Sequence, residues 1–416
     1  MNAMPPGLDA TRVAALADEP LDWRYKGIPS SWWGRTAAEV CAAAPNPLDD
    51  GAVGPLCVLS ESALAHNLAT MSAWCRDRGV ELAPHGKTHM APQLLARQLG
   101  AGACGVTVAT ISQARIYRAF GADRIMMANE VVDEAGLRWL AAELDGDSDF
   151  EFICWVDSVR GVELMSAALA SADAQRCVDV CVEIGVADGR TGCRGKTAVD
   201  EVARAVVATK RLRLVGVAGY EAVPGNDTAV AVRDYLREMR AAVTRLRPLF
   251  GTDQIVVTAG GSAHFDLVAD ELASGWADFP SVRTILRSGC YLTHDDGLYA
   301  RTSPLHGPSE LRPAMSVWAQ VTSRPQPDLA LLNMGRRDVS FDHDLPLPRT
   351  MPDSRVTRLN DQHAYVRLGA ADRDRVAVGD WAEFGISHPC TVFDKWQLIP
   401  VLDDRGRVVE LIRTFF

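Results

Sequence analysis

The chain has 416 residues, of which 48% are hydrophobic and 23% are charged, and its formal net charge is −10. This length allows one large domain and a smaller one, and the balanced composition excludes a disordered or fibrous protein. The acidic surface would repel nucleic acid and anionic lipid, so neither is an expected partner. No stretch approaches the roughly 20 apolar residues of a membrane helix, and no secretory signal is visible. We therefore expect a cytoplasmic protein, and we expect most of its ten cysteines to be reduced and buried.

Strands and helices alternate over the central part of the chain. From about Pro55, short apolar runs are followed by longer amphipathic stretches. Repeated units of this kind indicate an α/β protein with a parallel sheet covered by helices. About eight such units over roughly 250 residues favour a TIM-type (β/α)8 barrel over a doubly wound open sheet. The runs predicted as strands are residues 56–59, 80–83, 105–108, 124–127, 150–156, 178–184, 214–217, 255–258 and 284–286.

The last part of the chain has a different pattern. After residue 300 the segments are short and alternating, clusters of proline, glycine and aspartate separate them, and long amphipathic helices are missing. This pattern predicts a mostly β domain. The expected organisation is an N-terminal extension over residues 1–50, a barrel over 51–298 and a C-terminal β domain over 299–416. We expect the extension to pack on the β domain.

A lysine follows the second predicted strand. Residues 83–89 place Lys87 between His85 and His89 at the carboxyl end of that strand. In a barrel this end forms the functional face, where a lysine can act as a nucleophile. A solvated lysine at the start of a helix would have the same local sequence, so the motif alone leaves both interpretations open.

Two glycine turns follow the last two predicted strands. Gly260, Gly261 and Ser262 form one turn, and residues 289–291 form the other. Paired glycines let backbone N–H groups approach an anion, and phosphate sites after barrel strands seven and eight recur in this fold. The two turns together predict a phosphate site, although either alone could be a tight connection between a strand and a helix.

A histidine and a cysteine lie two positions apart in the C-terminal domain. On an extended strand, His388 and Cys390 would point to the same side. Imidazole and thiolate suit Zn²⁺, and two protein ligands would leave positions open for water or a substrate hydroxyl. The alternative is a buried cysteine beside an unrelated histidine.

Taken together, these segments resemble the D-serine dehydratase and D-threonine aldolase family of fold-type III pyridoxal 5′-phosphate enzymes. The resemblance runs from about residue 50 to the C-terminus. The segments that carry it are residues 84–89, 128–132, 183–192, Tyr220, 260–262, 289–291 and 388–396.

The resemblance implies a fold and a set of site residues. The fold is an alanine-racemase-like barrel with a C-terminal β domain, and members commonly form head-to-tail homodimers. Lys87 would hold pyridoxal phosphate as a Schiff base, while Arg190 and Tyr220 would lie beside the cofactor. Segment 388–396 is similar to the metal segment of D-serine dehydratases, whereas aldolase members usually carry aspartate where Cys390 stands. The implied phosphate loops contain Gly260, Gly261, Ser262, Gly289, Cys290 and Tyr291.

Two positions depart from the family pattern. Ala83 and Met90 stand where members often have arginine and lysine, respectively. Neither change touches the Schiff-base lysine, but both bear on how the charge of the substrate is recognised.

The expected activity is a pyridoxal phosphate- and metal-dependent lyase of D-β-hydroxy amino acids, of the D-serine dehydratase type that releases a 2-oxo acid and ammonia. Lys87 would remove the Cα proton, and Zn²⁺ on His388 and Cys390 would stabilise the departing β-oxygen. Mn²⁺ or another divalent metal is the alternative, although Mn²⁺ prefers carboxylate to thiolate. Retro-aldol cleavage of the D-threonine aldolase type is the alternative reaction. An amino acid racemase or a non-catalytic pyridoxal phosphate-binding protein would leave the metal pair without a role.

Overall fold

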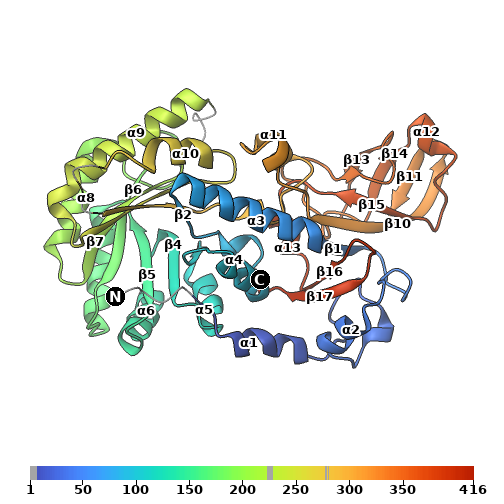
Figure 1. Ribbon diagram of the computed structural model, residues 1–416, viewed down its shortest axis with the longest axis horizontal. Coiled ribbons are helices and arrows are strands. Elements are labelled where there is room, and N and C mark those ends of the chain that lie inside the picture. The colour runs from blue at the N-terminus through green and yellow to red at the C-terminus, as the bar shows by residue number, and fades with distance from the viewer. Residues whose placement is uncertain (1–6, 223–227, 277–278, 280) are drawn as a thin grey trace. The chain divides into compact units, whose positions relative to one another are not determined.

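The structure is a computed structural model that describes residues 7–222, 228–276, 279 and 281–416 (Figure 1). These residues form two compact units. The barrel unit contains residues 7–9, Ser72–Lys87 and Gln98–Gly289. The mixed-sheet unit contains Ala10–Met71, Thr88–Arg97 and Cys290–Phe416. None of the helices in the described ranges is long and apolar enough to cross a membrane.

The barrel unit contains an eight-stranded parallel sheet in the order β2-β9-β8-β7-β6-β5-β4-β3. The first and last strands of this order are also joined, because Cys104 N donates to Leu82 O at 2.8 Å and Thr107 N donates to Pro84 O at 2.9 Å. The predicted TIM-type barrel is therefore confirmed. The strands are β2 (Glu81–Leu82), β3 (Val106–Val108), β4 (Arg124–Glu130), β5 (Glu151–Val156), β6 (Val178–Ile184), β7 (Leu212–Gly219), β8 (Gln254–Ala259) and β9 (Ser281–Leu286).

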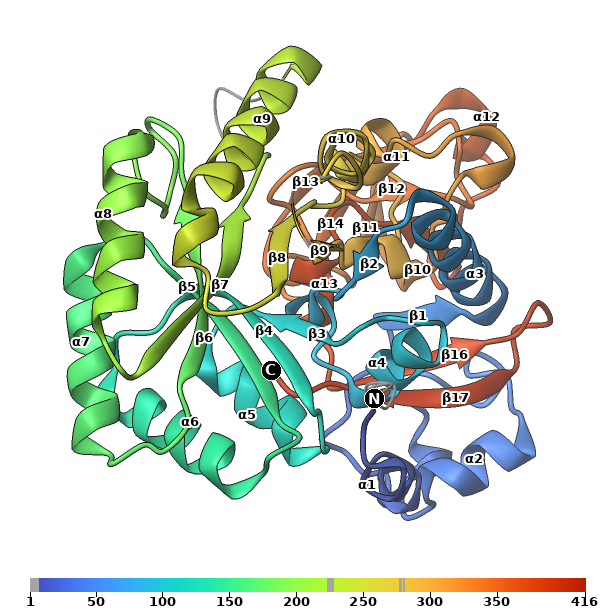
Figure 2. The ribbon, with the colours of Figure 1, turned by 60° about the vertical axis from the view of Figure 1, so that its left-hand side comes forward.

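Helices cover the outer face of this parallel sheet, as Figure 2 shows for α6 to α9. Several begin at a side chain that accepts a hydrogen bond from a backbone N–H of the first turn, as expected of good N-caps. These capping residues are Thr110, Asp133, Ser158 and Thr228. The helices are α5 (Ile111–Ala119), α6 (Glu134–Gly146), α7 (Val159–Ser171), α8 (Gly195–Ala208), α9 (Ala229–Leu246) and α10 (Phe265–Leu272). Two further helices, α3 (Glu61–Arg78) and α4 (Pro92–Gly100), contain residues of both units.

The mixed-sheet unit contains a nine-stranded sheet in which β13-β14-β11-β10-β1-β16-β17 form the main path and β12 and β15 branch from it. The strands are β1 (Leu56–Ser60), β10 (Met315–Gln326), β11 (Leu329–Leu332), β12 (Leu347–Pro348), β13 (Arg355–Leu359), β14 (Ala364–Arg367), β15 (Trp381–Gly385), β16 (Leu398–Leu402) and β17 (Val408–Arg413). The short helices are α1 (Ala10–Ala14), α2 (Ala37–Ala43), α11 (Leu298–Thr302), α12 (Ala370–Arg373) and α13 (Cys390–Phe393). The mostly β character predicted after residue 300 is therefore present.

One expected barrel strand lies in the other sheet. The run at 56–59 forms β1, which pairs antiparallel with β10 and parallel with β16. The expectation that it begins the parallel sheet is therefore wrong. All four side chains of the run are buried, and a strand buried on both faces has the same sequence pattern in a barrel and in the middle of a mixed sheet.

The N-terminal segment packs within the mixed-sheet unit. Its buried residues Leu21, Tyr25, Ile28 and Trp32 form one apolar cluster with side chains of β16 and β17. Trp32 is fully buried, and its indole N–H donates to Asp50 at 2.9 Å. The division of the chain at residues 50 and 298 stays a prediction.

Candidate functional site

Lys87 lies in a tight turn that an aromatic ring holds in place. The 3₁₀ turn Gly86–Thr88 follows β2, and His85 forms a parallel bridge with Thr107 of β3. The hydroxyl of Tyr117 donates to Gly86 O at 2.8 Å, and a Cβ on Gly86 would lie 2.6 Å from the Tyr117 ring. Only glycine leaves room for this contact, so the sequence around Lys87 positions it at the carboxyl end of β2.

His85, two residues before the lysine, lies in a strongly cationic environment. Its Nδ1 atom is buried and has no hydrogen-bond partner among the described residues. Burial lowers the pKa of His85 well below its usual value, and the positive charges of Lys87, Arg287 and Arg190 lower it further. An uncharged imidazole with an unused polar atom, beside three cations, fits an anionic ligand such as pyridoxal phosphate.

Arg190 and Tyr220, expected beside the cofactor, come together in the barrel unit. The Arg190 guanidinium carbon lies 4.3 Å from the centroid of the Tyr220 ring, which is a cation–π contact. Arg190 follows β6 and Tyr220 follows β7, so both lie near the carboxyl ends of neighbouring strands. The hydroxyl of Tyr235 donates to Ile184 O at 2.6 Å and accepts from Tyr220 N at 3.0 Å, which ties these two ends together.

The first glycine turn is held by a carboxylate of the chain itself. Glu221 is fully buried and accepts hydrogen bonds from Gly260 N at 2.9 Å and Gly261 N at 2.6 Å. The hydroxyl of Ser288 donates to Gly261 O at 2.8 Å and so links the turns after β8 and β9. Gly260 has a φ of +96°, which strongly favours glycine. Both amides thus have a partner in the structure, and the phosphate-binding role of the turn, including Ser262, stays a prediction.

Glu130, Glu183 and Arg287 lie near the same ends of the strands and were not named individually as site residues from the sequence. Burial raises the pKa of Glu130 to about 8, and the neighbouring carboxylates of Glu183 and Asp157 add to the shift. Glu130 Oε1 and Glu183 Oε2 are buried without a partner among the described residues. Arg287 is buried and donates to Thr258 Oγ1 and to Gly219 O, each at 2.7 Å. Glu130 and Glu183 belong to segments that carry the resemblance, and Arg287 follows a predicted strand, so a signal was available for each.

The mixed-sheet unit brings two thiols together. The Sγ atoms of Cys290 and Cys390 lie 3.4 Å apart, and Thr88 Oγ1 lies 3.3 Å from Cys390 Sγ and 3.9 Å from Cys290 Sγ. Cys290 and Tyr291, expected in the second phosphate loop after Gly289, are both buried in the 3₁₀ turn Cys290–Leu292. The thiol of Cys290 therefore contacts the residue that was predicted as a metal ligand.

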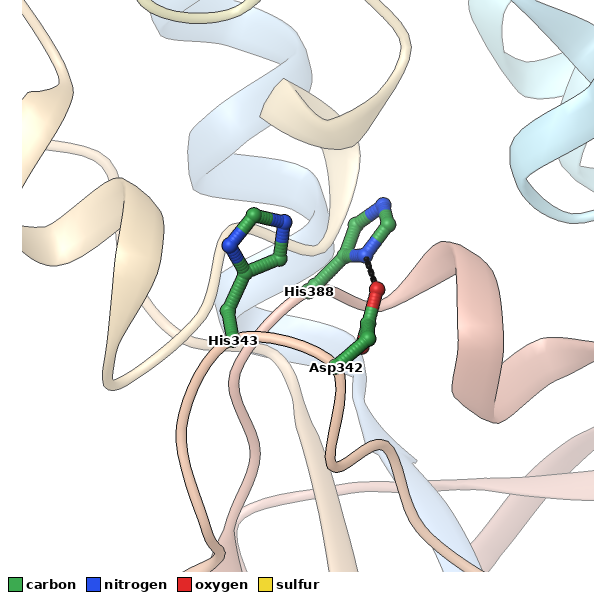
Figure 3. A group of neighbouring side chains, drawn as sticks. All are labelled: Asp342, His343 and His388. Atoms are coloured by element: carbon green, nitrogen blue, oxygen red, sulfur yellow. Dashed lines mark hydrogen bonds and ion pairs between the residues drawn. The ribbon is translucent and has the colours of Figure 1, made fainter.

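His388 is fixed from two sides by carboxylates. Its φ of +65° is unusual for a residue other than glycine, and its backbone N–H donates to the buried Asp295 at 2.7 Å. Its Nδ1 lies 2.5 Å from Asp342 Oδ2, as Figure 3 shows, with His343 beside it. Burial opposes protonation, but Cys390 and Asp342 together raise the pKa of His388 to about 9.

The chemistry of these donors fits a divalent metal ion. A hydrogen bond from Cys290 lowers the pKa of Cys390 well below its usual range, against the effect of burial, and His388 acts in the same direction. A thiol that ionises easily beside an imidazole is a donor pair suited to zinc. Asp342, His343 and His388 form a further group that could hold a metal, with one donor atom of each within 4.8 Å of the others.

Comparison with known proteins gives concordant matches. The family model described as the alanine racemase N-terminal domain matches residues 59–279, and the model described as a putative serine dehydratase domain matches residues 314–402. The D-threonine aldolase of an Arthrobacter species is 31% identical over 335 residues, which cover 78% of this chain and 83% of that protein.

Two solved structures agree in fold. D-threonine aldolase from Filomicrobium marinum has a TM-score of 0.75 at 25% identity, covering 88% of this chain and 95% of its own. D-threo-3-hydroxyaspartate dehydratase from a Delftia species has a TM-score of 0.71 at 22% identity, covering 87% and 97%. A variant of a D-threo-3-hydroxyaspartate dehydratase has been solved in a metal-free form.

Proposed function

Because the chain belongs to the alanine racemase-like family of pyridoxal phosphate enzymes that includes D-threonine aldolase, we propose that it is a metal-assisted lyase of D-β-hydroxy amino acids, of the dehydratase type. The observation that carries this proposal is the position of Thr88. It follows Lys87 directly in the chain, and its hydroxyl lies 3.3 Å from Cys390 Sγ. Thr88 and Cys390 both belong to the mixed-sheet unit, and Thr88 is the residue next to the proposed cofactor lysine in the chain.

The barrel unit would bind the cofactor through residues already in place. Lys87 would attach pyridoxal phosphate, and Arg190, stacked on Tyr220, and the buried Arg287 would offer positive charge to its anionic groups. Pyridoxal phosphate, when bound, supplies electron withdrawal from the substrate Cα. Lys87 Nζ would then hold and move the Cα proton as a general base.

The mixed-sheet unit would bind the metal through His388 and Cys390. A divalent metal there supplies Lewis-acid stabilisation to the β-oxygen of the substrate. Asp342, at 2.5 Å from Nδ1, would hold the His388 ring so that Nε2 is the ligating atom. The thiolate favours Zn²⁺ over Mn²⁺. The reason for proposing elimination rather than aldol cleavage is the resemblance of this segment to D-serine dehydratases, since aldolase members usually carry aspartate where Cys390 stands.

Aldol cleavage is the second candidate function, and one observation favours it. The Arthrobacter protein, which is 31% identical to this chain, is a D-threonine aldolase. In that reaction a base would remove the proton of the β-hydroxyl, and the Cα–Cβ bond would break.

The experiment that tests the proposal is a panel of D- and L-β-hydroxy amino acids, scored separately for 2-oxo acid and for aldehyde. We expect 2-oxo acid and ammonia from D-serine or D-threo-3-hydroxyaspartate, lost on chelation and restored by Zn²⁺. Aldehyde and glycine as the main products would establish the aldolase instead. A bound cofactor without turnover of any substrate in the panel would contradict both reactions.

A further inference from the structure

Two thiols from distant parts of the sequence are in contact in the mixed-sheet unit. Cys290 is the first residue of the 3₁₀ turn Cys290–Leu292, and Cys390 is the first residue of α13. Both are free thiols, and their Sγ atoms lie 3.4 Å apart. The two sulfur atoms of a disulfide lie roughly 2.0 Å apart, so the side chains would have to approach by about 1.4 Å to form the bond.

The two thiols differ in their access to solvent. Cys390 is half-buried, whereas Cys290 is 5% exposed. The hydroxyl of Thr88 lies 3.3 Å from Cys390 Sγ and 3.9 Å from Cys290 Sγ, so it contacts both sulfur atoms. A small oxidant would therefore reach Cys390 first, and the sulfur of Cys290 would lie beside the oxidised product. A reactive thiol next to a second thiol that resolves it is the usual arrangement of a redox-sensitive cysteine pair.

We propose that Cys290 and Cys390 form a peroxide-sensitive thiol pair, whose disulfide removes Cys390 from the metal site. The disulfide depends on the contact between the two sulfur atoms alone, whereas the loss of metal rests on the proposed metal-assisted function. With Cys390 oxidised, His388 would remain as the single member of the proposed ligand pair, which is too few ligands to retain Zn²⁺. The pair would thus switch the proposed lyase off when it is oxidised and on again when a thiol reduces the bond.

The oxidant of this switch is a hydroperoxide, ROOH. In the first step the Cys390 thiolate attacks the terminal peroxide oxygen, the O–O bond breaks, and the released alkoxide takes a proton from water to give ROH. Cys390 becomes a sulfenic acid, so the sulfur loses two electrons and the peroxide gains them. In the second step Cys290 Sγ attacks Cys390 Sγ, the S–O bond breaks, and the hydroxide leaves as water with the proton of the Cys290 thiol.

The test is mass spectrometry of the full-length, zinc-loaded protein after treatment with hydrogen peroxide and blocking of the free thiols. We expect two peptides linked through Cys290 and Cys390, and zinc released to a zinc-binding dye in step with the disulfide. Dithiothreitol with added Zn²⁺ should reverse both changes. The matched control is Cys41→Ser, which changes a half-buried cysteine of the same unit and should form the same linked peptides at the same rate.

The variant Cys290→Ser removes the resolving thiol. Cys390 should then be oxidised further to sulfinic and sulfonic acid, so the recovery of zinc binding by dithiothreitol should fall about tenfold. Equal recovery in Cys290→Ser and in the unchanged protein would overturn the proposal. Oxidised Cys390 without a link to Cys290 in the unchanged protein would also overturn it, and this measurement needs no variant.

The linked peptides can be detected without the cofactor and without turnover. A linked pair in a protein that turns over no hydroxy amino acid would count against the proposed lyase alone. Turnover by a protein that forms no linked pair under peroxide would count against the thiol pair alone. A linked pair that retains all of its zinc would overturn the proposed switch.

Discussion

The carboxylate of Asp342 and the imidazole of His388 are in close contact, with 2.5 Å between Oδ2 and Nδ1. Such a contact orients a ligating ring and raises its basicity. We expect Asp342→Asn to weaken zinc affinity by about 10- to 100-fold, because the amide cannot carry the negative charge that stabilises the metal-bound ring. Competition with a zinc-binding dye gives the dissociation constant.

The control for this change is Asp361→Asn. Asp361 forms an exposed ion pair with Arg337 in the same unit, with 3.7 Å between the charged atoms. Its removal should leave zinc affinity unchanged. Equal zinc affinity in Asp342→Asn and in the unchanged protein would contradict the positioning role.

Lys87 is the proposed attachment point of the cofactor. Lys87→Ala should abolish the covalent attachment of pyridoxal phosphate and reduce turnover by several orders of magnitude, because no other amine is expected to replace it. Borohydride reduction followed by peptide mass spectrometry identifies the labelled residue. Lys196→Ala, an exposed lysine at the start of α8, should keep both labelling and activity. A cofactor still fixed by borohydride in Lys87→Ala would show that the anchor lies elsewhere.

Glu130 should make the stability of the protein depend on pH. Burial and nearby carboxylates raise its pKa to about 8 from an ordinary 4.5, so the folded state keeps a proton that the unfolded state loses between these values. The free energy of unfolding therefore falls as pH rises through this window, by at most about 1.4 kcal/mol per pH unit. Glu130→Gln removes this titration, and the variant should gain stability relative to the unchanged protein as pH increases.

Urea unfolding at several pH values between about 5 and 8 measures this difference. The control is Glu134→Gln, which changes an exposed ion-pair partner of Arg138 on α6. It should leave the pH dependence of the free energy of unfolding unchanged. Parallel profiles for Glu130→Gln and the unchanged protein would mean that Glu130 is ionised in the folded state.

Glu221 is expected to stabilise the first glycine turn. Its two carboxylate oxygens accept from Gly260 N and Gly261 N, and glutamine could accept only one of these bonds while placing an NH₂ group against the other donor. Glu221→Gln should lower the free energy of unfolding by about 1–3 kcal/mol. Thermal or urea unfolding measures this loss of stability. The control is Glu201→Gln on the exposed face of α8, which should leave the free energy of unfolding unchanged. If this turn binds the cofactor phosphate, pyridoxal phosphate affinity should fall in the same variant.

The repeating strand–helix units and the local motifs could be predicted from the amino-acid sequence alone. The periodicity of apolar residues in strands and helices is a local pattern that extends over a few residues. The glycine at position 86 is also a local requirement, because the backbone before Lys87 packs against the ring of Tyr117. The contact between Arg190 and Tyr220 also agrees with the resemblance, since both residues follow neighbouring strands. Local patterns therefore identified the fold class, while the roles of the candidate residues stay predictions. The homodimer expected from the resemblance stays a prediction.

The pairing of distant segments could not be predicted from local sequence patterns. β1 pairs with β10 and β16 although its buried run suits a barrel strand, because strand pairing depends on partners more than 200 residues away. The thiol of Cys290 contacts the thiol of Cys390, and the glycine-turn pattern around Cys290 does not predict this contact. The same holds for Glu221, whose carboxylate binds a turn about 40 residues further along the chain. Local propensity carries no information about such pairings, because the free energy that selects them arises from packing and hydrogen bonding between segments that are far apart in sequence.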